Sequence, residues 1–187
     1  MKSDITKGIY VSVQGEDGKT NGIPWEVLKK MGDSLQALVL DLATFNLDGV
    51  TKPDPKDYVL ELFDFQPGSA IQAFRIRETE LINAFDNEDK ISVAKDLDEL
   101  LNISATGNFM TISDKYPDDE QRKRIAKGLF DFTNSSTRSP IKIVSINNDR
   151  EITEVYKINK LSTKTYKYIS NTGSGENVKT IKTKDRQ

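Results

Sequence analysis

Three carboxylates could do chemistry because of where the sequence places them. Glu61 and Asp64 lie in a β-rich run that begins at Tyr58, and Asp41 follows the apolar run Ala37–Leu40. Asp and Glu side chains can act as general acids or bases and can bind Mg²⁺ through their oxygens. A magnesium-dependent enzyme that uses these carboxylates is therefore one functional hypothesis.

Glu61 is the most informative of the three because its expected position is on an apolar face. The run from Tyr58 to Arg77 predicts a β-hairpin with a Pro-Gly turn, in which Phe65 faces Ala70. One face then carries Val59, Glu61, Phe63, Phe65, Ala70, Gln72, Phe74 and Ile76. An unpaired carboxylate there would be costly, or burial would raise its pKa. We predict a buried carboxylate at Glu61 and favour a structural pairing for it, with no catalytic residue, metal or cofactor assigned.

The loop Gly15–Thr20 matches only the end of a phosphate-binding P-loop pattern. The full pattern needs a glycine where Val13 stands, and the chain from Asn21 to Pro24 separates the loop from the next helix. The carboxylates of Glu16 and Asp17 would also repel a phosphate. We interpret this segment as a solvated loop.

Basic residues next to tyrosines support a second hypothesis. The other face of the hairpin carries Tyr58, Arg75 and Arg77, and lysines interleave with tyrosines towards the end of the chain. Such residues can contact the phosphates and stack on the bases of single-stranded nucleic acid. The residues we select for this role are Tyr58, Arg75, Arg77, Lys157, Lys164 and Lys167. Lysines also protect edge strands from aggregation, and the pI of about 5.4 is unlike that of a dedicated nucleic-acid binder.

The composition narrows the chemistry further. The 187 residues include no Cys and no His, which excludes disulfides, thiolate chemistry and the commonest ligands of zinc. The net charge of −2 hides an uneven distribution, because residues 136–187 hold 11 of the 27 basic residues and 5 of the 29 acidic residues. The first residues lack a secretory signal pattern, and no apolar run is long enough to span a membrane. We therefore expect a cytoplasmic protein.

Periodicity predicts the elements that must position these residues. A strand is expected at Gly8–Val13, and a long helix is expected from Trp25 to about Asn46. The apolar stripe of this helix is Trp25, Leu28, Met31, Leu35, Leu38, Leu42 and Phe45. Two further helices are expected, one over residues 87–104 that Gly107 ends, and one that starts at Pro117 with acidic residues first.

After the Asn134–Pro140 segment the pattern changes to alternation. Strands are expected at residues 141–146, 152–158, 165–169 and 178–183. The predicted fold class is α+β, with a small mixed or antiparallel sheet covered by the long helix and two further helices. The predicted division is an α+β domain over residues 1–135 and a β-rich basic subdomain or sheet extension over residues 136–187.

We interpret the chain as a non-enzymatic cytoplasmic subunit or adaptor that binds another protein or itself, through an exposed strand edge in the C-terminal part. Nucleic-acid binding by the basic C-terminal part and a magnesium-dependent enzyme stay as alternatives. We expect no membrane partner.

Overall fold

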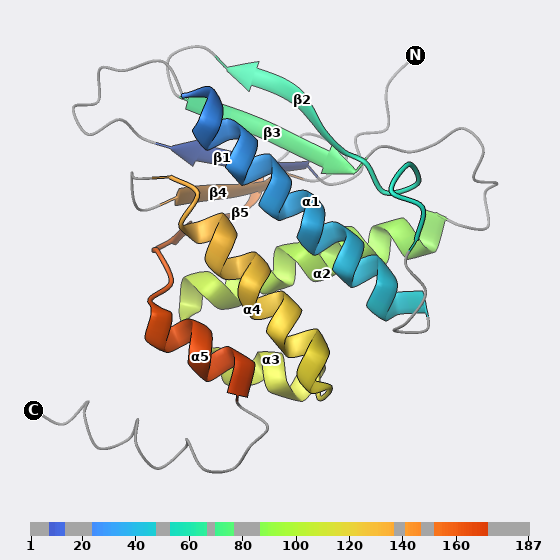
Figure 1. Cartoon of the computed structure of the whole chain (residues 1–187). Helices are drawn as coiled ribbons and strands as arrows, with labels where there is room; N and C mark the ends of the chain where they lie inside the picture. Colours follow the sequence, from blue (N-terminus) through green and yellow to red (C-terminus); the bar gives the residue numbers. More distant parts are fainter. Residues whose placement is uncertain are drawn as a thin grey trace, which may run out of the picture.

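The computed structural model describes residues 8–13, 24–47, 53–66, 70–76, 87–136, 141–146 and 152–171. Strands and helices lie in two layers (Figure 1). In chain order the elements are β1 (Gly8–Val13), α1 (Trp25–Leu47), β2 (Leu60–Gln66), β3 (Ala70–Ile76), α2 (Asn87–Thr106), α3 (Met110–Lys115), α4 (Asp119–Thr133), β4 (Ile141–Ile146), β5 (Ile152–Ile158) and α5 (Thr163–Asn171). The architecture is α+β, as predicted.

The described strands form one antiparallel sheet in the order β2-β3-β1-β4-β5. β1 lies in the middle and pairs with both β3 and β4. Strands from both sides of the predicted boundary at residues 135 and 136 therefore share one sheet. The boundary itself stays a prediction.

One face of the sheet points into the core, and the pairing register shows which residues lie on it. Ile141 pairs with Ile158, and both are buried, as is Ile143. Lys142 pairs with Lys157, one residue out of phase with the isoleucines. Since successive residues of a strand point to opposite faces, this lysine pair lies on the face away from the core.

The hairpin forms as predicted, but its register is different. Phe65 pairs with Gln72 rather than Ala70, and the pairing shifts between Leu62 and Asp64. Such a bulge inserts one residue and reverses the face on which the preceding residues lie. Glu61 therefore pairs with Arg75 and does not share a face with Phe74, which corrects our prediction.

The first helix, α1, forms the centre of the core. Its buried residues Met31, Leu35, Leu38 and Leu42 confirm the predicted stripe. Burying each such side chain contributes about 1.5–3 kcal/mol. Trp25 is an exception, because 70% of its surface is exposed. As the first residue of α1 it extends beyond the packed turns, so its predicted place in the core is wrong.

Helices α2 and α4 also match the predictions. α2 ends at Gly107, whose φ of 75° is the left-handed conformation typical of a helix end. α4 starts after Asp118, whose side chain accepts a hydrogen bond from the backbone N–H of Gln121 at 3.0 Å. The short helix α3 between them was not predicted.

Helix α5 replaces the strand expected at residues 165–169. Its start is capped by Ser162, whose Oγ accepts a hydrogen bond from the backbone N–H of Thr165 at 3.1 Å. Ile169 is fully buried, and the Tyr166 ring lies 5.4 Å from that of Phe130. The β-rich C-terminal part is thus not observed, since the chain after β5 is helical as far as residue 171. The strand expected at residues 178–183 lies outside the described residues.

Candidate functional site

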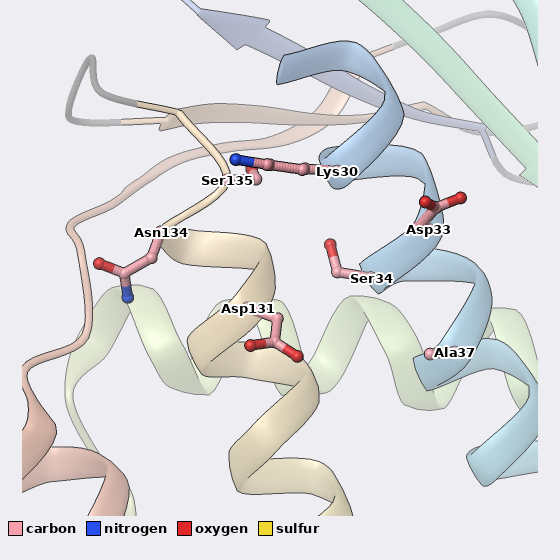
Figure 2. A pocket seen from close by; sticks show the side chains of 7 residues that line it. All are labelled: Lys30, Asp33, Ser34, Ala37, Asp131, Asn134 and Ser135. Carbon is pink, nitrogen blue, oxygen red and sulfur yellow. The ribbon is translucent and has the colours of Figure 1, made fainter. Parts of the chain in front are cut away.

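A groove lies between the first half of α1 and the end of α4 (Figure 2). Its volume is about 380 Å³, which is in the lower part of the range of small ligand sites. Most of the lining side chains are exposed, so the groove is open to solvent. Its lining residues are Lys30, Asp33, Ser34, Ala37, Asp131, Asn134 and Ser135.

Close packing of α1 on α4 sets the position of these two helices, which form the walls of the groove. A Cβ atom placed on Gly128 of α4 would lie 2.6 Å from Cγ of Leu38, so any larger residue there would force Leu38 or the helices to shift. On the surface, Arg124 of α4 and Asp41 of α1 lie 3.7 Å apart. The groove opens beyond this contact, where the small side chains of Ser34 and Ala37 leave space on α1.

Both carboxylates of the groove are already paired. Lys29 Nζ lies 2.6 Å from Asp33, and Lys127 Nζ lies 2.6 Å from Asp131. The hydrogen bond to the carboxylate is the main cause that raises the pKa of each lysine. These pairs are exposed and add little stability. Their effect is to cancel the negative charge of the groove.

Lys30 is the cation that these pairs leave unmatched. It is exposed and has no ion-pair partner in the structure over the described ranges. In Figure 2 its side chain extends from α1 towards the chain at Ser135. The hydroxyls of Ser34 and Ser135 donate to the carbonyls of Met31 and Phe132, so their oxygens can still accept a hydrogen bond. The groove therefore offers one positive charge among neutral polar groups.

Asn134 connects the groove to the start of α5. Its Nδ2 donates to the carbonyl of Phe130 at 2.9 Å and to the carbonyl of Leu161 at 3.2 Å. The backbone N–H of Leu161 in turn donates to Oγ1 of Thr133 at 3.1 Å. These bonds hold the segment before α5 against the end of α4.

The three candidate catalytic carboxylates come from different surroundings. Glu61 is half-buried on β2 opposite Arg75, whereas Asp64 pairs with Ala73 on the other side of the bulge. Asp41 lies on α1, where it faces Arg124. Among the residues that can be described, no group of three or more Asp, Glu, His or Cys side chains could hold a metal ion.

Of the hairpin residues of the nucleic-acid hypothesis, Tyr58 is the one whose side-chain burial the structure describes. Tyr58 is only 8% exposed, and its carbonyl accepts a hydrogen bond from Gln36 of α1 at 2.8 Å. Arg75 is paired in register with Glu61, and Arg77 lies outside the described residues.

The lysines and tyrosines of the C-terminal part lie in different surroundings. Lys157 is exposed on β5, and Lys164 and Lys167 are exposed on α5, a helix rather than a strand. Tyr156 is half-buried and donates to Oδ1 of Asp98 at 2.9 Å, while Tyr166 packs on Phe130. The tyrosines thus pack against the core, whereas the lysines are exposed to solvent.

The groove was not predicted from the sequence. Its signals were weak: small residues at positions 34 and 37 inside a stripe of large ones, and the Asn-Ser-Ser run from Asn134 that we interpreted as a boundary. β5, in the C-terminal part, is an outer strand of the sheet over the described ranges, and binding of a partner to its edge stays a prediction.

No protein-family model, curated protein sequence or solved structure matches the chain. In the part of the chain that the structure describes, no helix is both long enough and apolar enough to cross a membrane.

Proposed function

We propose that the protein is a non-catalytic binding subunit that holds another protein in the groove between α1 and α4. The observation that supports this proposal is Lys30, an exposed ammonium group without an ion-pair partner among the described residues, at a groove whose carboxylates are already paired. A carboxylate of a partner would complete the charge balance there. The proposal keeps the cytoplasmic location expected from the sequence.

The groove suits recognition of a protein better than chemistry on a small molecule. Its hydroxyls donate to main-chain carbonyls of their own helices or helix ends, so neither hydroxyl donates to a carboxylate that could activate it as a nucleophile. The volume accommodates a side chain and part of the chain that carries it. Electrostatic matching of this kind determines which partner binds more than how tightly it binds.

The test is purification of the tagged protein from its own host at low salt. Lys30→Glu reverses the unmatched charge, and Lys95→Glu makes the same change at an exposed position of α2 far from the groove residues in sequence. We expect the wild type and Lys95→Glu to retain one protein in stoichiometric amount and Lys30→Glu to lose it. Equal retention by all three, or retention of no protein, would exclude the groove as the binding site.

Self-association is separated from binding of a different protein by the mass of the purified material. A second copy of the chain as the partner would give a dimer in analytical ultracentrifugation that Lys30→Glu dissociates. A different protein would give a heteromeric complex.

Nucleic-acid binding is the second candidate, and one observation favours it. Lys142 and Lys157 pair directly across β4 and β5, an arrangement of like charges that destabilises a sheet unless an anion lies nearby. The triple change of Lys157, Lys164 and Lys167 to Glu should then abolish retention on heparin at low salt. The matched control changes Lys30, Lys56 and Lys95 to Glu. Equal retention of the two triple variants would end this hypothesis.

A further inference from the structure

Helix α5 carries a row of positive charge on its exposed side. Lys164 and Lys167 are three residues apart, so they lie on the same face of the helix. Both are exposed, and neither has an ion-pair partner over the described ranges. The opposite side of α5 carries Ile169 and Tyr166, which pack into the core, so the lysine side faces outwards.

The segment that precedes the lysines of α5 is connected to the groove through Asn134. Asn134 lines the groove, and its amide donates to the carbonyl of Leu161, three residues before Lys164. Asn134 is thus the residue through which the groove and the start of α5 meet.

We propose that the partner presents an acidic segment, which places one carboxylate at Lys30 and continues over Asn134 onto the lysine row of α5. This inference rests on the proposed function and specifies the chemical class of the partner. The groove holds no net negative charge that would repel such a segment, because Asp33 and Asp131 are neutralised by their own lysines.

An acidic protein segment fits this surface better than a nucleic acid. Single strands bind through phosphate contacts and through bases stacked on exposed aromatic rings. Here Tyr156 and Tyr166 are held by Asp98 and Phe130 instead. A peptide can place its carboxylates singly, beside the lysines alone.

The experiment measures fluorescence anisotropy of a labelled poly-glutamate peptide, with a thymidine oligonucleotide of equal length as the competing probe. Poly-glutamate should bind saturably at low salt and weaken as the ionic strength rises to about 150 mM, where the Debye length falls to about 8 Å. The variants Lys30→Glu, Lys164→Glu and Lys167→Glu should each weaken binding about three- to tenfold. Lys56→Glu and Lys95→Glu serve as controls and should leave it unchanged.

The outcomes separate this inference from the proposed function. If poly-glutamate does not bind, or binds the lysine variants as well as the controls, the acidic partner is refuted even where Lys30→Glu still loses the partner from host extract. If Lys164→Glu and Lys167→Glu weaken binding but Lys30→Glu does not, the groove is not part of the site and the path over Asn134 is refuted. Tighter binding of the oligonucleotide, lost in the same variants, would replace the acidic segment by nucleic acid.

Discussion

The packing of α1 on α4 forms the groove, and the substitution Gly128→Ala tests that packing directly. The added Cβ would lie 2.6 Å from Cγ of Leu38 and 3.5 Å from its Cδ1. Leu38 is fully buried. The new methyl group therefore has to push the two helices apart or force Leu38 out of its rotamer.

Two opposing effects set the size of the change. Alanine is a better helix former than glycine by about 1 kcal/mol, which favours the variant. Overpacking in a rigid core costs about 3 kcal/mol at such a position. The net prediction is a loss of about 2 kcal/mol in the free energy of unfolding, or about 4–8 °C in Tm for a chain of this size.

The decisive comparison is made in the background of Leu38→Ala, which removes the atoms that the new methyl group would meet. Leu38→Ala alone should cost about 2–5 kcal/mol because it leaves a cavity. Adding Gly128→Ala to it should then stabilise the protein by about 1 kcal/mol, so the sign of the effect reverses. Urea unfolding of the four proteins measures this coupling. A Gly128→Ala variant that is as stable as the wild type, or one that destabilises both backgrounds equally, would refute the packing.

Three further predictions concern α3 and its connections. Gly107→Ala should lower stability by about 1 kcal/mol in thermal unfolding, because the φ of 75° strains alanine while its Cβ meets nothing within 4 Å; Gly107→Asn should lose less. Burial raises the pKa of Tyr116 to about 12, so its contribution to stability should be constant below pH 10 and fall as pH rises from 10 towards 12. Tyr116→Phe should reduce this fall and cost nothing at neutral pH, since the buried hydroxyl has no hydrogen-bond partner among the described residues. Arg122→Ala should cost about 2–4 kcal/mol in urea unfolding, because Arg122 is 2% exposed and donates to the carbonyls of Tyr116 and Pro117; a loss below 1 kcal/mol would contradict that role.

Local patterns were sufficient for the elements whose signals lie within a few turns of chain. The stripe from Trp25 to Phe45 predicted α1, Gly107 marked the end of α2, and a helix was expected to start at Pro117, two residues before α4 begins. These signals act through bonds between near neighbours, such as the cap at Asp118. Predictions from such signals therefore do not depend on the rest of the fold.

The wrong predictions involve contacts between distant parts of the chain. Thr165 to Ile169 alternates like a strand, but packing of Tyr166 on Phe130 and burial of Ile169 favour the helix. Ser162 followed by Thr165 was a capping signal that could have indicated it. The hairpin bulge moved Glu61 to a different face, which period-two reasoning cannot detect.

The groove could not be predicted because it exists only once α1 lies against α4. Ser34 and Ala37 leave a space only because Leu38 of α1 packs on Gly128 of α4 nearby. Leu38 and Gly128 are about ninety positions apart in the sequence. The charge of Lys30 could not be singled out from the sequence for the same reason. The groove carboxylates Asp33 and Asp131 pair with Lys29 and Lys127, which leaves Lys30 without an ion-pair partner among the described residues.

The most direct test of the proposed function is the amount of protein partner that co-purifies with Lys30→Glu compared with Lys95→Glu. Both variants change one exposed lysine to glutamate, so their net charges are identical. The proposal predicts a stoichiometric protein with Lys95→Glu and none with Lys30→Glu. The same partner in the same amount with both variants would contradict it.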